Sequence, residues 1–212
     1  MRCYTIDGLA YPSVTTVLKV TESPADMERL ARWRQRVGET EAQRLSQEAR
    51  DRGTELHACC EQVLRGQGEP EAVSELTYPF WQSCRPVLAR VSEPQLIEAF
   101  VYQRRHRYAG TLDAYAAVDG EPGYIVDFKT ANRPKRAEWI RDYLLQTVAY
   151  AAAAYERYGV SVQGAAVAIA VPEQEAQLFK LSRSQMLELW REWCQRVERF
   201  WQLYTPQALA QL

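Results

Sequence analysis

The spacing of apolar positions predicts helices in the first part of the chain. Residues 1–12 are short and rich in turn residues, and residues 13–65 have helical spacing. Ser13 can cap a first helix and Ser23 a second, because a serine side chain accepts a hydrogen bond from the exposed amides of a first turn. Gly38 separates the second helix from a third.

The spacing changes after about residue 90, where alternating apolar and β-branched positions predict strands. The predicted strands are Leu96–Tyr102, Gly110–Val118, Tyr124–Thr130 and Gly164–Val171. The remaining predicted helices are residues 71–90, with breaks near Pro79 and Pro86, then Lys135–Tyr158, which Gly159 stops, and Ser182 to about Tyr204, where Ser182 and Gln185 match a capping box. This order predicts an α/β (α+β) fold in which a central mixed β-sheet is flanked by helices.

A chain of 212 residues suits one domain with a core large enough to fold alone. We expect a single domain over residues 1–212. It is divided into a mainly helical section at 1–90, a sheet core at 91–180 and a C-terminal helix at 181–212. The helix that carries Gln146 and Tyr150, one turn apart, belongs to the core section, where the pair lies on one side of the helix.

One predicted strand carries charge on a face that should be buried. The sequence YIVDFKT puts Asp127 and Lys129 on one face, since side chains alternate along a strand. Asp113 lies seven residues before Gly120, and Asp127 lies seven after it. A turn centred on Gly120 would therefore set the two aspartates opposite each other in an antiparallel pair.

Two facing carboxylates repel each other unless a cation lies between them. Mg²⁺ or Mn²⁺ takes oxygen ligands of this kind, and Lys129 beside the ion could stabilise charge that develops on a phosphate. The alternative is a cross-strand ionic cluster without chemistry. The Gln146 and Tyr150 pair likewise has a second interpretation, as part of a helix that packs through its apolar face.

The net charge of −1 excludes a protein that coats nucleic acid over its whole surface. Residues 98–141 nevertheless hold eight Lys or Arg against six Asp or Glu, so any nucleic-acid site is local. The basic residues of this segment are Arg104, Arg105, Arg107, Lys129, Arg133, Lys135, Arg136 and Arg141. An earlier group, Arg29, Arg32 and Arg36 with Trp33, suits a single-stranded path or a solvated helix face.

The five cysteines form no C-x-x-C pair, so we expect neither a disulfide framework nor a zinc or iron–sulfur site. The start of the chain lacks the apolar stretch of a signal peptide, and no apolar run reaches the length of a membrane span. We therefore expect a cytoplasmic protein, bacterial or from phage-infected cells, with no membrane partner.

Four segments together resemble the RecB-like branch of the PD-(D/E)xK nuclease superfamily. They are RGTELH at 52–57, GTLD at 110–113, IVDFKT at 125–130 and QTVAY at 146–150. Outside them, PSVTTVL at 12–18, the stretch from Trp33 to Ala42 and Glu98 resemble the mitochondrial genome maintenance exonuclease group and its phage and bacterial relatives. The resemblance covers about residues 11–155 and implies a restriction-endonuclease-like core.

The resemblance also implies roles for single residues. It implies that His57, Asp113, Asp127 and the Phe128 carbonyl are metal ligands and that Lys129 is the catalytic lysine. Supporting or DNA-contacting roles are implied for Arg52, Glu98, Arg133, Lys135, Arg136, Gln146 and Tyr150. The expected cofactor is Mg²⁺ or Mn²⁺, without an iron–sulfur cluster, since Cys194 alone lies beyond the hairpin.

The function that these expectations favour is a divalent-metal-dependent DNA exonuclease, with Asp113, Asp127 and Lys129 as catalytic residues. The expected partner is DNA, single-stranded or with a free end, and a monomer is favoured. Three alternatives remain open at this stage. They are a structure-selective endonuclease or DNA-end trimming nuclease in a complex, a non-catalytic DNA-binding member of the fold, and an unrelated metal enzyme acting on small phosphates.

Overall fold

The structure of the protein, a computed structural model, describes residues 1–204. Its helices are α1 (Val14–Val20), α2 (Pro24–Val37), α3 (Glu39–Leu64), α4 (Tyr78–Leu88), α5 (Arg141–Tyr158) and α6 (Arg183–Leu203), with a short 3₁₀ helix at Ala137–Trp139. Its strands are β1 (Cys3–Ile6), β2 (Leu9–Pro12), β3 (Val91–Gln103), β4 (Tyr108–Val118), β5 (Glu121–Thr130), β6 (Gly164–Ala170) and β7 (Gln177–Ser182).

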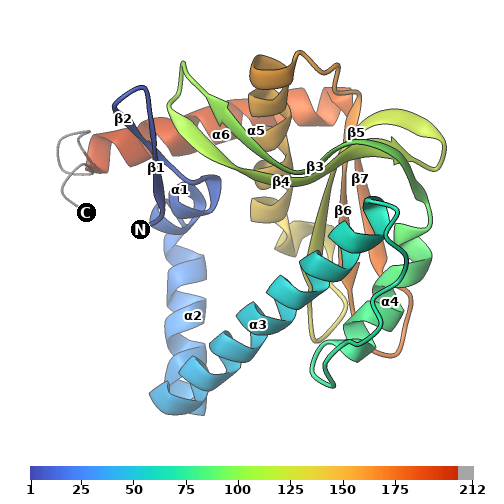
Figure 1. The fold of residues 1–212 in the computed structure, drawn as a ribbon. Coiled ribbons are helices and arrows are strands. Elements are labelled where there is room, and N and C mark those ends of the chain that lie inside the picture. The colour runs from blue at the N-terminus through green and yellow to red at the C-terminus, as the bar shows by residue number, and fades with distance from the viewer. Residues whose placement is uncertain (205–212) are drawn as a thin grey trace.

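The main sheet has five strands in the order β3-β4-β5-β6-β7, and a separate hairpin pairs β1 with β2 (Figure 1). Neighbouring strands of the main sheet are antiparallel, except that β5 and β6 are parallel because α5 crosses over between them. The mixed sheet flanked by helices confirms the predicted fold class.

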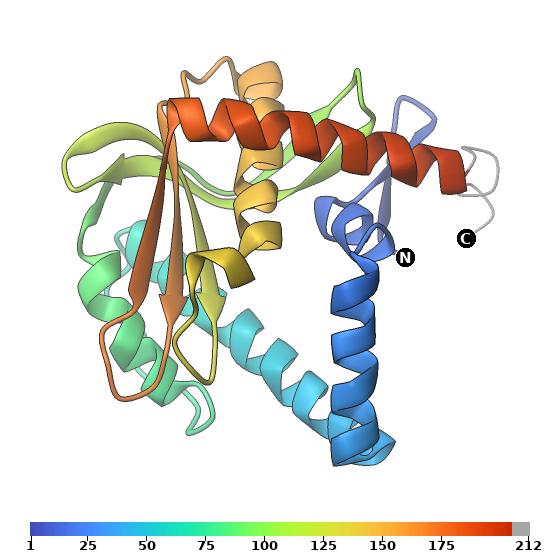
Figure 2. The same ribbon diagram turned by 180° about the vertical axis from the view of Figure 1, so that it is seen from behind.

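Helices cover both faces of the sheet and give two cores. The first core lies between the sheet and α5, α6 and α1, with Trp193 and Phe200 fully buried; Figure 2 shows this side. The second core lies between the other face and α3 and α4, with Phe80 and Trp81 among its members. All residues of β6 are buried, as expected for a central strand.

The predicted helix caps are confirmed. The Ser13 side chain accepts from the Thr16 amide at the start of α1, and the Ser23 side chain accepts from the Asp26 amide at the start of α2. Ser182 forms a capping box at the start of α6. These caps satisfy amides that have no partner within the first turn of a helix.

The N-terminal segment and the fourth helix differ from expectation. Residues 1–12 form the β1–β2 hairpin, whose turn uses Asp7 and Gly8 at positive φ. Helix α4 begins at Tyr78, so residues 71–77 were wrongly predicted as helix. Pro79 lies in its first turn, where the missing amide costs nothing, and Pro86 lies inside the helix near its end, so neither breaks it.

The later elements also differ in part. Strand β7 was not predicted, and it pairs with β6 at the edge of the sheet. The helix expected from Lys135 begins only at Arg141, after the 3₁₀ turn, and ends at Gly159 in the left-handed conformation as predicted. The C-terminal helix ends at Leu203, next to its predicted end, and residues 205–212 of the predicted C-terminal section lie outside the described residues. Within the described range, no helix combines the length and the apolar character that a membrane crossing requires.

Candidate active site

The β4–β5 hairpin brings the two predicted aspartates to one place. Its turn uses Asp119 and Gly120, both at positive φ, which matches the twist of a two-residue hairpin. The strands pair Ala114 with Val126, so the next position along this register is Asp113 beside Asp127. The ladder ends there, because the Phe128 amide donates to Asp113 Oδ2 at 2.7 Å.

Strand β3 adds a third carboxylate. Its register pairs Ile97 with Ala114 and Ala99 with Leu112, which sets Glu98 opposite Asp113. Three neighbouring strands therefore carry carboxylates in one row. Glu98 has a φ of 46°, a left-handed conformation that costs a non-glycine residue free energy and is concentrated at functional sites.

The side chains of β4 switch from one face of the sheet to the other at this row. On β4, Leu112 packs in the first core and Ala114 in the second, although an undistorted strand would point both side chains to the same face. Tyr115 then packs in the first core again. Glu98, in the left-handed conformation, lies in this row, and both Glu98 and Asp113 approach His57 of α3.

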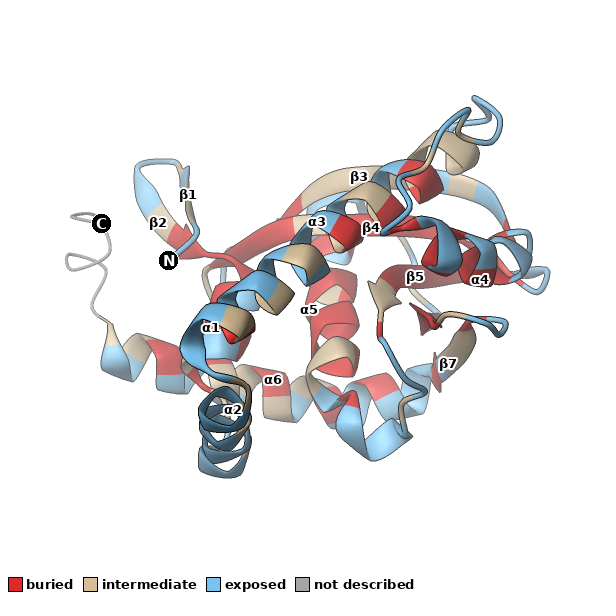
Figure 3. Cartoon of the chain, turned by 90° about the horizontal axis from the view of Figure 1, so that it is seen from below, coloured by how far each residue is buried: buried red, intermediate tan, exposed pale blue. Residues whose placement is uncertain are grey.

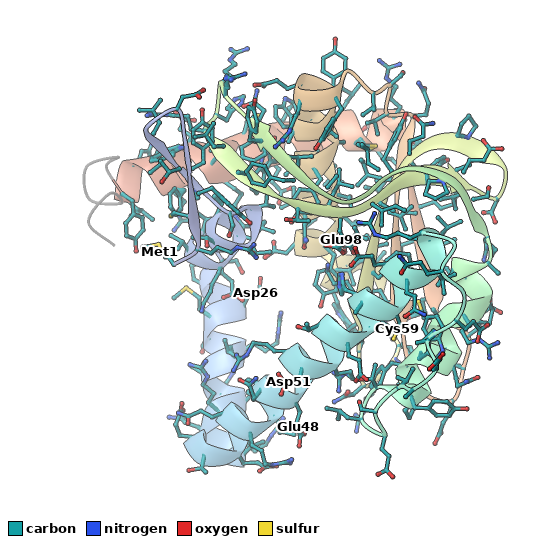
Figure 4. The ribbon with its side chains drawn as sticks, viewed as in Figure 1. Met1, Asp26, Glu48, Asp51, Cys59 and Glu98 are labelled. Carbon is teal, nitrogen blue, oxygen red and sulfur yellow. The ribbon has the colours of Figure 1, made fainter. Side chains whose placement is uncertain are left out.

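Helix α3 brings an imidazole close to this row. His57 Nδ1 lies 3.3 Å from Asp113 Oδ1 and 3.9 Å from Glu98 Oε1. One ligand atom from each of these three residues lies within 4.8 Å of the others, a spacing that a single metal ion can bridge. Figure 4 labels Glu98 where α3 passes the sheet.

Asp127 is the most constrained of the carboxylates. It is fully buried, and neither of its oxygens has a hydrogen-bond partner within the described residues. Burial raises the pKa of Asp127 to about 6. Lys129 Nζ forms a charge pair with Asp127 Oδ2 at 2.5 Å, which leaves Oδ1 open to a further cation.

The neighbouring carboxylates explain the protonation state of the His57 imidazole. Burial by itself would lower the pKa of His57, but the Asp113 carboxylate raises it and the balance is a pKa of about 10. In the metal-free protein the imidazole is therefore protonated and partly offsets the three carboxylates. A metal ion would take the place of that proton, since a coordinated imidazole is neutral.

Helix α5 forms the opposite wall. The Gln146 side-chain amide donates to the Tyr150 hydroxyl at 3.2 Å, and both side chains are buried. Lys129 Nζ lies 5.5 Å from the centre of the Tyr143 ring. Sequence reasoning missed Tyr143. Its position three residues before Gln146 and seven before Tyr150, on the same side of the helix, could have identified it.

The glycine of the GTLD segment has a packing role at this wall. A Cβ at Gly110 would lie 2.7 Å from Cε1 of the Tyr150 ring, closer than carbon atoms approach. Gly110→Ala is therefore expected to lower the free energy of unfolding by about 1–3 kcal/mol, measured by urea denaturation.

Gly53→Ala is the matched control. Gly53 lies inside α3, and a Cβ added there would meet no atom within 4 Å, so alanine is expected to stabilise the helix by about 0.5–1 kcal/mol. Equal stability of the Gly110→Ala and Gly53→Ala proteins would contradict the close packing of Tyr150 on β4.

The remaining predicted site residues lie around the cluster at different depths. Arg52 is buried on α3, where its Nε donates to Thr130 Oγ1 at 3.2 Å and its guanidinium stacks on Phe80. It therefore ties α3 to the end of β5. The Phe128 carbonyl lies 3.5 Å from Lys129 Nζ, on the side of β5 that leads to the cluster.

The basic segment after β5 is held in place by β7. The Lys135 amide donates to Gln177 Oε1 at 2.6 Å, and the Gln177 side-chain amide donates to the Lys135 carbonyl at 3.0 Å. Arg133 and Arg136 are on this segment, and Arg136 stacks on Trp139. These arginines are not part of the buried cluster and can only reach a ligand that extends beyond it.

Comparison with known proteins bears on this arrangement. No family model matches the chain. "Mitochondrial genome maintenance exonuclease 1" of Mus musculus is 27% identical over 202 residues, and the protein of the same name of Homo sapiens is 27% identical over 199 residues. The chain is similar to these exonucleases. Each match covers 89% of this chain and 58% of the relative.

The similarity to mitochondrial genome maintenance exonuclease 1 confirms the resemblance drawn from the sequence motifs. It covers most of the chain, so it extends well beyond the four short segments. The chain spans 58% of the length of these relatives. The similarity supports a nuclease function at a general level, and it leaves metal, strand preference and individual residues to be argued from the site.

Proposed function

We propose that this protein is a divalent-metal-dependent DNA exonuclease that acts on single-stranded ends. The observation that carries the proposal is a cluster in which the buried Asp113 and Asp127 lie with the partly exposed His57 and Glu98, and with Lys129 beside them. Buried charges of one sign cost free energy unless enough counter-charge is present. Asp127 Oδ2 pairs with Lys129, and the unpartnered Oδ1 supports a cation as further counter-charge.

The residues fit an oxygen-rich ion such as Mg²⁺ or Mn²⁺. The ligand atoms of His57, Glu98 and Asp113 lie within 4.8 Å of one another. We infer that these residues would hold the ion and that Asp127 and the Phe128 carbonyl would complete its ligands. When bound, such an ion lowers the pKa of a coordinated water and polarises the phosphate. A softer metal would prefer thiolates, and the candidate ligands contain none.

The other residues of the cluster can orient the attacking water and the strand and can neutralise charge on the phosphate. The Lys129 ammonium is held between Asp127 and the Tyr143 ring, where it can orient the attacking water or offset negative charge on the phosphate. Gln146 and Tyr150 form a hydrogen-bonded wall that restricts where a strand can lie. Proton release from His57 upon metal binding would leave its imidazole free to coordinate.

A cavity of about 810 Å³ is lined by Tyr143, the ring beside Lys129, and supports a single-stranded substrate. Lys135 also lines it, and the rest of the lining comes from Glu22 and from α2, where basic and aromatic residues outnumber the single acid Asp26. The α2 residues of this lining include Arg29, Arg32, Trp33 and Arg36. Arginines bind phosphates while a ring stacks on bases, which is the usual mode of single-strand binding.

Helix α2 has no buried residue, so packing gives no reason for its position (Figure 3). Arg29 pairs with Asp26 and Arg32 with Glu28, but these pairs are largely exposed to solvent. Exposed pairs of this kind contribute little to stability, so the arginines can turn to phosphates at small cost. We infer that α2 is retained to hold substrate.

Digestion of end-labelled strands tests the proposal. With Mn²⁺ or Mg²⁺, a linear single strand is expected to shorten from an end while a circular strand of the same sequence stays intact. With EDTA, neither is cut. Cleavage of the circle would favour the structure-selective endonuclease, and binding without metal-dependent cleavage would favour the non-catalytic DNA-binding member.

A further inference from the structure

A cluster of aromatic and arginine side chains lies on β3 and the elements next to it, outside the residues of the candidate centre. We name it the arginine–aromatic cluster. Its members are Arg2, Tyr4, Phe100, Tyr102, Arg104, Arg157 and Tyr158. They come from β1 and the residue before it, β3, the turn after β3 and the end of α5, segments that are far apart in the sequence.

The rings of the cluster form a continuous surface. The Tyr4 and Phe100 ring centres are 5.0 Å apart, and those of Phe100 and Tyr102 are 6.2 Å apart. The buried Tyr11 of β2 meets Tyr102 edge to face. In Figure 1, β1 and β2 lie beside the outer ends of β3 and β4, where a bridge between Ser13 and Ala109 joins them.

Each arginine of the cluster stacks on a ring. The Arg157 guanidinium carbon lies 4.9 Å from the Phe100 ring centre and 5.2 Å from that of Tyr102. Arg104 lies 5.0 Å from the Tyr102 ring, and Arg2 lies 5.1 Å from the Tyr4 ring. A stacked guanidinium keeps its N–H groups in its own plane, so they remain free to bind an anion.

Little of this positive charge is used within the protein. Arg2 and Arg157 form no ion pair with any residue of the described range 1–204, and both are exposed. Arg104 lies 3.3 Å from Asp7, but both side chains are more than half exposed, and such a contact is weak. Glu156 accepts from the Arg104 amide and lies on the same side. Three cations thus meet two exposed acids.

The arginine–aromatic cluster and the cavity beside α2 lie at opposite ends of the row of carboxylates. The carboxylates of the centre form a row across β3, β4 and β5. The cavity beside α2 reaches this row at the β5 end, through Tyr143 and Lys129. The arginine–aromatic cluster begins at the β3 end, because Phe100 is two residues beyond Glu98 on the same strand.

We propose that the arginine–aromatic cluster binds the phosphate backbone of the nucleic-acid strand on the far side of the cleaved bond from the α2 cavity. The inference rests on the proposed nuclease function and adds a second contact surface to it. A strand that lies in the cavity and crosses the row of carboxylates reaches Phe100 and Tyr102 next. There the stacked guanidinium groups meet its phosphates, which carry the complementary charge.

Binding of a labelled oligonucleotide tests the cluster without cleavage. The variant is Arg104→Gln with Arg157→Gln, and the probe is a fluorescent oligo-dT of about 20 nucleotides in EDTA, followed by anisotropy over a salt series. The variant is expected to bind about tenfold more weakly. The slope of log K against log salt is expected to fall by about 1.4, the value for two phosphate contacts on a single strand.

A matched variant separates this effect from the loss of charge in general. Arg183→Gln with Arg191→Gln removes the same charge from the exposed side of α6, outside the cluster. It is expected to keep the wild-type affinity and salt slope within twofold. A four-nucleotide oligo-dT is too short to contact both the α2 cavity and the arginine–aromatic cluster. The wild-type protein is therefore expected to bind it more weakly than the longer strand.

The outcomes distinguish this inference from the proposed function. If the Arg104 and Arg157 variant keeps the affinity and salt slope of the wild type, the cluster is not a nucleic-acid contact and the inference is overturned. Metal-dependent digestion by the wild type would still support the nuclease function in that case. If the wild type cuts no strand with any metal but its binding depends on these arginines, the nuclease proposal fails and the contact surface stands.

Discussion

Lys129→Ala is expected to reduce metal-dependent cleavage by about 10²- to 10³-fold, the size of effect seen when one group that stabilises transition-state charge is removed. The Lys129 ammonium lies 2.5 Å from Asp127 and is only 17% exposed, so solvent screens it weakly. The buried Arg52 cannot replace it, because its guanidinium is turned to Phe80 and Thr130. Initial rates on an end-labelled strand with saturating Mn²⁺ measure the effect.

Two controls make that result specific. Lys19→Ala removes an exposed lysine at the end of α1 and is expected to leave the rate unchanged. Circular dichroism of the Lys129→Ala protein checks folding, because the change removes a cation that lies beside a buried carboxylate. A folded Lys129→Ala protein with the wild-type rate would remove Lys129 from the mechanism.

Asp127→Asn is expected to abolish both metal-dependent cleavage and the effect of metal on the stability of the protein. The Asp127 carboxylate is fully buried, one oxygen pairs with the Lys129 ammonium, and the other has no partner among the described residues. Asparagine has nearly the same shape without the negative charge that would attract a metal ion.

The effect of Mn²⁺ on the melting temperature tests the same assignment. Mn²⁺ is expected to raise the melting temperature of the wild-type protein and to have little effect on the Asp127→Asn protein, since a ligand that binds only the folded state stabilises it. Asp119→Asn is the matched control on the same hairpin, because Asp119 is partly exposed and distant in the register. It should keep the response to Mn²⁺. An Asp127→Asn protein that still responds to Mn²⁺ would contradict the assignment.

Local signals predicted much of the fold. Ser13, Ser23 and Ser182 marked helix starts correctly, because capping depends on a few adjacent residues. The pair Asp119 and Gly120 marked the hairpin turn, and counting outward from it brought Asp113 to Asp127. A short turn leaves little freedom in the register of the strands that it joins.

Contacts between distant segments could not be predicted in this way. The approach of His57 to Glu98 depends on how α3 packs across the sheet, and no local pattern encodes that distance. Strand β7 and the β1–β2 hairpin are short edge elements whose residues are only partly buried, so their apolar alternation is weak. The left-handed conformation of Glu98 has no sequence signal, since glutamate seldom adopts it.

The two walls of the candidate centre belong to different cores, because β4 contributes side chains to both. His57 is fixed by the second core through its neighbours Leu56 and Cys60, whereas Tyr150 belongs to the first core. The row of carboxylates lies at the seam between them. A chain in which one core has formed without the other has only one wall of the centre. Under the proposed function, the ability to cut DNA would therefore arise only when both cores have formed.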